Sequence, residues 1–235
     1  MFKIKIADLV IEIDNRYDFV KRMCRDYIEE NAPALFSVRA SDSDLEEEKA
    51  ASEEIFSDGY IESICVYRHI CNKLPLYNAF LLHASVIEVD GMAYAFSAPS
   101  GTGKSTHTRL WLDRFGERAR IINGDKPIMR FSGDELIVYG TPWCGKEGYN
   151  INTSSPLSAL CFLNRGQENK IARCDEGSAV MKLFHQILLP QDEETANALF
   201  ELLDKMVCNI PIYELYCNIS PEAAEVAYNG MKKAE

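Results

Sequence analysis

The sequence is poor in the features that mark membrane, secreted and nucleic-acid-binding proteins. It has no run of 18 apolar residues, and charges stand within its first few positions, so we expect neither a membrane span nor a signal peptide. Its 25 Lys and Arg are outnumbered by 36 Asp and Glu, giving a formal net charge of −11, which argues against a nucleic-acid partner. We therefore expect a cytoplasmic protein that binds neither membranes nor nucleic acids.

Paired cysteines are also missing. The eight cysteines are scattered, with no C-x-x-C pair and no Cys/His cluster at zinc spacing. In a reducing compartment such cysteines serve mostly as small buried hydrophobic residues. Proline is scarce, at nine residues, while apolar residues make up 47% of the chain, enough to fill one sizeable core or two small ones.

Residues 1–78 predict a small α+β portion. Alternating apolar residues indicate short strands, and apolar residues at three- and four-residue spacing indicate amphipathic helices. The predicted elements are a hairpin that turns at Ala7-Asp8, helices over 17–30 and 60–74, a strand over 36–39, and an acidic run over 41–54 expected as a solvated loop or surface helix.

Residues 79–235 predict a second domain that is built around a Gly-rich loop. Asp90-Gly91 stands between the β-rich runs 86–88 and 92–96, a strong hairpin signal because such a turn needs positive φ. The loop follows the second run directly, and a predicted helix that ends at Gly116 follows the loop. This order of strand, loop and helix disfavours the alternative, a Gly-rich turn without a ligand.

The loop predicts a binding site for nucleotide phosphates. It matches the pattern G-x-x-x-x-G-K-[ST], except that Ala98 replaces the first glycine. Gly101 and Gly103 allow successive backbone N–H groups to turn inward, and the dipole of the following helix adds attraction for an anion. We expect ATP and Mg²⁺ as ligands, with Lys104 at the β- and γ-phosphates and Ser105 on the metal. The predicted nucleotide-binding residues are Ala98, Pro99, Ser100, Gly101, Thr102, Gly103, Lys104, Ser105 and Thr106.

An acidic group is expected at the end of a neighbouring strand. A predicted strand over 119–122 is followed by Asn-Gly-Asp-Lys-Pro, so Asp125 is the candidate catalytic carboxylate and Mg²⁺ ligand. An ordinary Asx turn is the alternative for this segment. A hairpin is predicted next, over 128–131 and 136–139, so the sheet should be mixed and not purely parallel.

Three elements, in this order, resemble the HPr kinase/phosphorylase group, which has the phosphoenolpyruvate carboxykinase-type nucleotide fold. They are His83 in LLHASVIEV, the loop over 100–105, and Asp125 in IINGDKP, and the resemblance covers about residues 81–130. It implies a kinase core with a mixed sheet, Mg-ATP on the loop, Ser105 on the metal, and Asp125 near the acceptor hydroxyl.

The chain also departs from that family. The family typically has two adjacent acids after the strand, whereas here Gly124 precedes Asp125 and Lys126 follows it. Either Asp125 alone serves as base or metal ligand with help from elsewhere, or the site binds nucleotide and turns over poorly. No counterpart of the region that docks HPr is present, so we expect the acceptor to be a small hydroxyl compound or a peptide or protein serine. In this the chain is similar to small kinases that accompany peptide modification systems.

Further candidates are less specific. His83 is either a satisfied core histidine or a neutral imidazole that contacts phosphate or orients Asp125. Arg165, at the end of a buried strand over 157–163, either stabilises the transferring phosphoryl group or is a surface residue. His107 and Arg109, on the helix after the loop, either face the nucleotide or are exposed to solvent, and we expect exposure.

The segment over 140–150 contains three glycines, two aromatic residues and a Lys/Glu pair. It is either a lid for the acceptor or a structural connection in which Trp143 packs on the core. In the first case Lys146 would contact phosphate and Glu147 would assist the metal. The remaining sequence predicts helices over 177–189 and 193–208, a strand over 212–217, and a last helix with Ser220 as N-cap.

The sequence thus predicts an α/β fold: a mixed sheet with a P-loop, similar to the HPr kinase C-terminal domain, and a small α+β N-terminal portion. The predicted catalytic residues are Lys104, Asp125, His83 and Arg165. We expect an ATP-dependent kinase, and homo-oligomers are compatible with the sequence. The alternative is an ATP-binding regulatory or partner-binding module with little phosphotransfer. A nucleoside kinase of the parallel-sheet kind is disfavoured, because hairpins replace the strand-helix repeats it would need.

Overall fold

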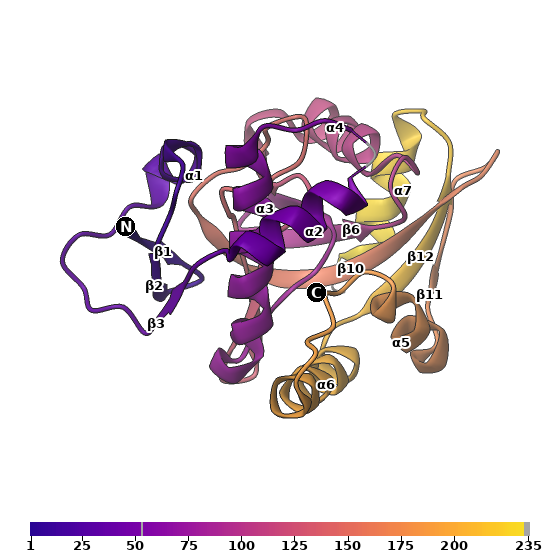
Figure 1. The fold of residues 1–235 in the computed structure, drawn as a ribbon. Helices are drawn as coiled ribbons and strands as arrows, with labels where there is room; N and C mark the ends of the chain where they lie inside the picture. The colour runs from indigo at the N-terminus through magenta and orange to yellow at the C-terminus, as the bar shows by residue number, and fades with distance from the viewer. Residues whose placement is uncertain (53, 233–235) are drawn as a thin grey trace.

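A small sheet forms one end of the molecule (Figure 1). The computed structural model describes residues 1–52 and 54–232. The predicted N-terminal hairpin is confirmed, and both turn residues, Ala7 and Asp8, have positive φ. The third strand pairs in parallel with the second. The three strands are β1 (Phe2–Ile6), β2 (Leu9–Ile13) and β3 (Phe36–Val38).

Three helices belong to the N-terminal portion, one of them between β2 and β3 and two after β3. They are α1 (Asp18–Met23), α2 (Asp42–Ala51) and α3 (Asp58–Lys73). The acidic run therefore forms a surface helix, which Ser41 caps, although residue 53 lies outside the described residues. The predicted helix over 17–30 is wrong in length, because the chain leaves α1 at Cys24 and Ile28 pairs with Ile4 of β1.

The main sheet is mixed, as predicted, and has nine strands. Its main path runs β4-β8-β9-β10-β6-β5-β7, with β12 beside β10 and β11 beside β12. Strand β10 pairs in parallel with β6 and β12, and the other pairs are antiparallel. The strands are β4 (Ala79–Leu81), β5 (Ser85–Val89), β6 (Met92–Ser97), β7 (Ala119–Asn123), β8 (Ile128–Ser132), β9 (Glu135–Tyr139), β10 (Ser154–Arg165), β11 (Lys170–Arg173) and β12 (Ile212–Cys217).

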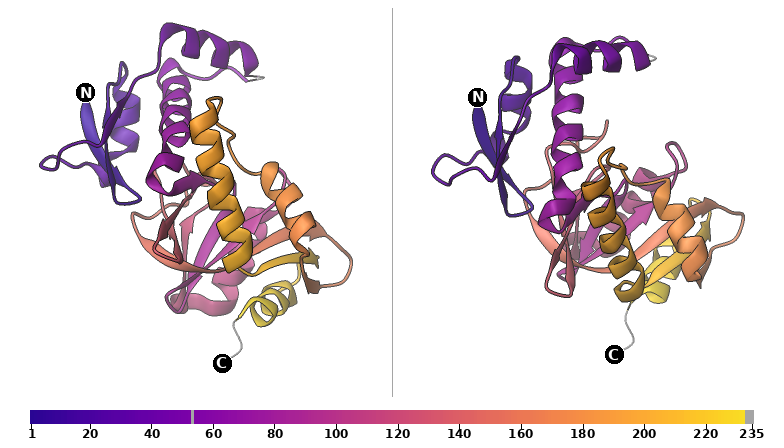
Figure 2. Two further views of the ribbon diagram at one scale, coloured as in Figure 1. Left: turned by 90° about the horizontal axis from the view of Figure 1, so that it is seen from below. Right: turned by 60° about the horizontal axis from the view of Figure 1, so that its bottom comes forward.

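Helices cover the main sheet on both faces (Figures 1 and 2). One face packs against α4 (Lys104–Phe115) and α7 (Glu222–Met231), and the other against α5 (Glu176–Phe184) and α6 (Glu193–Asn209). Strand β10 supplies both cores by alternation: Leu160 and Phe162 face α5 and α6, while Cys161 and Leu163 face α4 and α7. Such a strand has apolar residues on both faces, which explains the run over 157–163, where Ser158 is the exception.

The N-terminal portion has a core of its own. That core includes buried residues from Phe2 to Ala79, together with Ile128 and Trp143 of the main-sheet region. The division at residues 78 and 79 stays a prediction. Ser220 is not an N-cap, since α7 begins at Glu222 without a side-chain cap. No helix within 1–52 and 54–232 combines the length and apolar character that crossing a bilayer requires.

Candidate functional site

Topology brings the predicted site residues to one edge of the main sheet. Strands β6, β7 and β10 run in the same direction, so their carboxyl ends share an edge, and antiparallel β5 begins there. The Gly-rich loop (residues 98–105) leaves β6, Asp125 follows β7, Arg165 ends β10, and His83 precedes β5. Carboxyl ends of adjacent strands are a common place for ligand sites in α/β folds.

The Gly-rich loop has the backbone geometry of an anion-binding turn. Gly101 has φ +75 and Gly103 has φ +127, values that residues with a side chain rarely adopt, and a Cβ at either position would meet nothing within 4 Å. The loop ends in the first turn of α4, where unpaired backbone N–H groups carry partial positive charge. The segment is therefore a turn and not an extended strand.

Lys104 lies in the first turn of α4 and is only 7% exposed. Its ammonium Nζ donates a hydrogen bond to the carbonyl oxygen of Ala98 at 2.9 Å. Burial lowers the pKa of Lys104, and the negative charges of Asp125 and Glu147 partly offset this effect. Among the described residues, no Asp or Glu forms an ion pair with this buried ammonium. The negative charge of a bound phosphate would supply the missing partner.

Asp125 and His83 form a hydrogen-bonded pair. His83 Nε2 lies 3.0 Å from Asp125 Oδ1, and His83 Nδ1 lies 3.0 Å from Gln186 Oε1, so both ring nitrogens are engaged. Burial raises the pKa of Asp125, but the hydrogen bond to His83 and the surrounding positive charges outweigh it, and the net pKa is lowered. Lys126 Nζ approaches the other carboxylate oxygen at 3.7 Å. His83 is thus hydrogen-bonded to Asp125, and a role at phosphate or in orienting Asp125 stays a prediction.

A buried side chain that the sequence interpretation missed holds Asp125 in place. Asn123 Oδ1 accepts from the backbone N–H groups of Asp125 and Lys126, at 2.9 and 2.7 Å. Its Nδ2 donates to the carbonyl oxygens of Thr141 and Trp143, at 3.1 and 3.2 Å. The predicted Asx turn exists, and it joins the acidic turn to the segment over 140–150. A buried amide at a strand end, two residues before an acid, was the available signal.

The loop and Asp125 face a common cavity of about 460 Å³, which we call the loop cavity. Lys104, Ser105 and Thr106 line one side, and Asp125 and Lys126 line another. Gly145, Lys146 and Glu147 complete the lining from the segment over 140–150. Six of the nine predicted nucleotide-binding residues, Ser100, Gly101, Gly103, Lys104, Ser105 and Thr106, therefore line the same cavity as the predicted acid, whereas Ala98, Pro99 and Thr102 do not.

The segment over 140–150 has a buried half and an exposed half, and a role as a lid stays a prediction. Trp143 is buried, stacks on Tyr67 of α3 with ring centroids 4.2 Å apart, and donates from Nε1 to the carbonyl oxygen of Ser63 at 2.9 Å. This half is a structural connection. Residues 145–148 protrude beyond it with exposed side chains, and both Gly145 and Gly148 have positive φ.

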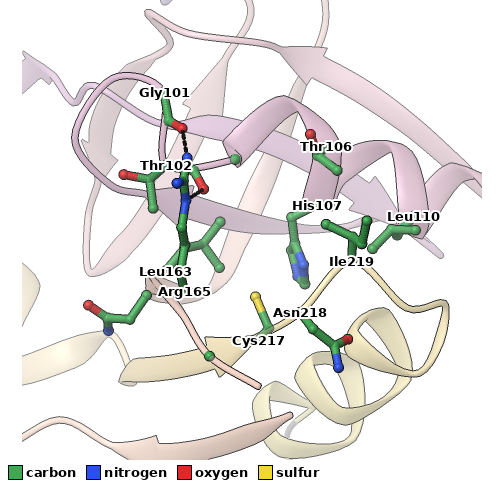
Figure 3. Close-up of a pocket in the computed structure, with 13 residues that line it drawn as sticks. Gly101, Thr102, Thr106, His107, Leu110, Leu163, Arg165, Cys217, Asn218 and Ile219 are labelled. Carbon is green, nitrogen blue, oxygen red and sulfur yellow. Dashed lines mark hydrogen bonds between the residues drawn. The ribbon is translucent and has the colours of Figure 1, made fainter. Parts of the chain in front are cut away.

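Arg165 lies against the Gly-rich loop. Its Nη2 donates to the carbonyl oxygen of Gly101 at 2.6 Å and its Nε to that of Thr102 at 3.3 Å (Figure 3). The guanidinium lines a second cavity, beside the loop, and is absent from the lining of the loop cavity. In this geometry Arg165 fixes the loop backbone, and a role at the transferring phosphoryl group stays a prediction.

The expectation of an exposed His107 is wrong, whereas Arg109 is exposed as expected. His107 is 3% exposed and accepts a hydrogen bond from Trp111 Nε1 at 3.0 Å. The spacing of His107 and Trp111, four residues apart on α4, places them on one face and was the signal for burial.

The residues present fit a nucleotide with one Mg²⁺ ion. Mg²⁺ commonly takes one or two carboxylate or hydroxyl ligands from the protein and the rest from phosphates and water. Ser105 and Asp125, which both line the loop cavity, have such oxygens. A cluster of three or more His, Cys, Asp or Glu suited to a metal is absent from the described parts of the chain. A metal here would therefore depend on phosphate oxygens.

Comparison with known proteins assigns the family. The family model of the SynChlorMet cassette protein ScmC matches residues 59–226, which is most of the chain. The chain belongs to the ScmC family. In this ScmC-family chain, the matched residues include the Gly-rich loop, Asp125 and His107, and they exclude the small N-terminal sheet.

Relatives outside this family are more distant. No curated protein matches the chain. Among solved structures, the chain is similar to the Hpr(Ser) kinase/phosphatase from Coxiella burnetii, with 11% sequence identity and a TM-score of 0.36. The match covers 64% of this chain and 95% of that one.

Proposed function

We propose that this ScmC-family chain is an ATP-dependent kinase that transfers the γ-phosphoryl group of Mg-ATP to a hydroxyl group of a small molecule or peptide. The observation that carries the proposal is the loop cavity, where the Gly-rich loop, Lys104 and Asp125 face one space. Lys104 and Asp125 are close enough for each charge to shift the pKa of the other. A phosphate beside the ammonium would therefore share the loop cavity with the carboxylate.

The chain's own residues would bind and orient the phosphates. Backbone N–H groups of the Gly-rich loop donate to phosphate oxygens, and Lys104 exchanges its bond to Ala98 for one to a phosphate oxygen. Arg165 holds the loop in this shape. Ser105 and Asp125 would hold Mg²⁺, which supplies charge neutralisation at the phosphate oxygens.

Asp125 is suited to receive the acceptor proton. Its lowered pKa keeps it ionised at neutral pH, and His83 fixes the direction of its carboxylate. In the proposed step, a bond forms between the acceptor oxygen and the γ-phosphorus, and the bond from that phosphorus to the bridging oxygen of ADP breaks. The acceptor proton passes to Asp125. Catalysis would come mainly from positioning and charge stabilisation.

A neighbouring cavity supports an acceptor with an apolar group beside its hydroxyl. This cavity, of about 640 Å³, shares Tyr60, Lys126 and Gly145 with the loop cavity. The stacked rings of Trp143 and Tyr67 form one wall, and no Asp or Glu lines it among the described residues. An apolar and neutral or anionic acceptor would suit such walls.

The test is incubation of the full-length protein with γ-labelled ATP and Mg²⁺ against a panel of hydroxyl compounds and serine peptides. Wild type should yield labelled product, and Asp125→Asn should bind nucleotide but lose about 100-fold or more in rate. Tight nucleotide binding by wild type with no labelled product from any acceptor would instead support a regulatory binding module. The ion pair of Lys126 with Asp125, at 3.7 Å, is the feature that favours this second candidate.

A further inference from the structure

A second cavity, of about 400 Å³, adjoins the Gly-rich loop (Figure 3). It is bounded by α4, the end of β10 and the bend that follows β12, so we call it the α4–β10 cavity. Gly101, Gly103 and Thr106 line both this cavity and the loop cavity. A ligand whose phosphates lie on the loop could therefore extend past Thr106 into the α4–β10 cavity.

The tautomer of His107 is fixed by its neighbour on α4. Trp111 Nε1 can only donate, so His107 Nε2 must accept, at 3.0 Å. Burial lowers the pKa of His107 to about 4, so the ring is neutral at physiological pH. A neutral imidazole that accepts at Nε2 carries its proton on Nδ1. His107 Nδ1 is therefore a hydrogen-bond donor.

That donor has no partner. Two buried side-chain atoms lack a hydrogen bond in the described portion of the chain, His107 Nδ1 and Asn164 Nδ2, and both residues line the α4–β10 cavity. A buried donor without an acceptor is costly and rare, and it commonly marks a position that a ligand or water satisfies. In Figure 3 the His107 ring extends from α4 toward Cys217 and Asn218, across the space of the cavity.

The other walls suit a flat apolar ring. Leu110, Leu163 and Ile219 contribute aliphatic surface, and Arg165 contributes a planar guanidinium that the loop carbonyls hold in place. His107 Nδ1 is covered in this conformation, so a ligand reaching it must displace a lining side chain. Ile219 is 80% exposed and can move without opening the core.

We propose that the α4–β10 cavity binds the purine base of the nucleotide, and that a ring nitrogen of the base accepts a hydrogen bond from His107 Nδ1. The inference rests on the proposed function, because the phosphates of the same nucleotide must occupy the Gly-rich loop. It goes beyond that function by assigning His107 as the residue that recognises the base. The N–H at His107 Nδ1 can pair only with an acceptor atom of the ligand. Purines offer such acceptors at N1, N3 and N7.

The test is calorimetry of the full-length protein with Mg²⁺ and ADP, 1-deaza-ADP, 3-deaza-ADP, 7-deaza-ADP or inorganic tripolyphosphate. One deaza analogue should bind about tenfold more weakly than ADP, because it leaves the donor unpaired. The inference is overturned if all three analogues bind as tightly as ADP. Binding of tripolyphosphate reports on the loop alone, so its absence would count against the proposed function and not against the base site.

Variants separate the hydrogen bond from general packing. His107→Phe keeps a ring but removes the donor, so it should abolish the difference between ADP and the weakened analogue, while tripolyphosphate binds as before. Arg109→Gln, an exposed position on the same helix, is the matched control and should retain that difference. A His107→Phe protein that still discriminates as wild type does would overturn the assignment. If this variant does not fold, the analogue series on wild type decides.

Discussion

Replacing Lys104 with methionine should separate nucleotide binding from stability of the nucleotide-free protein. Methionine has similar length and no charge, so the variant loses the bond to Ala98 but also the cost of burying an ammonium. These effects oppose each other, and we expect a net change within about 1 kcal/mol, or about 2–4 °C in Tm for a chain of this size.

The ATP-induced rise in Tm should change far more than the Tm of the nucleotide-free protein. At an ATP concentration 100 times Kd, ligand binding stabilises wild type by about 2.7 kcal/mol, or roughly 5–10 °C. Loss of a charged hydrogen bond to phosphate costs about 2.7 kcal/mol of affinity, a factor of about 100. At the same ATP concentration the variant would gain only about 0.4 kcal/mol, or about 1 °C.

Thermal unfolding followed by fluorescence, with and without Mg-ATP, measures both quantities. Lys205→Met is a matched control, because Lys205 Nζ also donates to a loop carbonyl oxygen, that of Gly133 at 2.7 Å, but lies outside the lining of the loop cavity. The control should keep the full ATP-induced rise in Tm. If Lys104→Met keeps it as well, the ammonium does not bind phosphate and the proposed function is wrong.

Three further predictions follow from the site and its supports. In unfolding scans, Asp125→Asn should keep at least about half of the Mg-ATP-induced rise in Tm, because the loop still binds phosphate. Gly140→Ala should destabilise the fold by about 3 kcal/mol in denaturant titrations, because its Cβ would lie 1.9 Å from the carbonyl oxygen of Ile151. Burial raises the pKa of Asp44, but hydrogen bonds from Ser41 and His69 bring it to about 2. Because this folded-state pKa is below the unfolded value, about 1 kcal/mol of stability should be present above pH 4 and lost as pH falls toward 2, and Asp44→Asn should remove this dependence.

Local sequence patterns were sufficient to predict turns, helix ends and strands whose conformation depends on adjacent residues. The hairpins at Ala7-Asp8 and Asp90-Gly91 have the positive φ values that their residues predicted, and the helix after the Gly-rich loop ends at Gly116 as expected. Strand β7, which places Asp125 at the edge of the sheet, was also predicted to within one residue. These features depend on backbone preferences of a few neighbouring residues.

Long-range contacts account for what the sequence did not show. The predicted helix over 17–30 stops early because Ile28 pairs with Ile4, a contact that periodicity cannot reveal. Strands β4 and β11 were missed, since β4 is three residues long and most of β11 is exposed. The burial of His107 depends on Phe96 of β6, whose ring centroid lies 4.5 Å away, as much as on its own helix.

The amide of Asn123 limits how the loop cavity can open. The Asn123 side chain is hydrogen-bonded to the turn that carries Asp125. It is also hydrogen-bonded to Thr141 and Trp143, near the start of the segment over 140–150. The two walls are therefore tied together at this amide, whereas the exposed residues 145–148 lie outside these hydrogen bonds. Under the proposed function, a bulky acceptor would enter past residues 145–148.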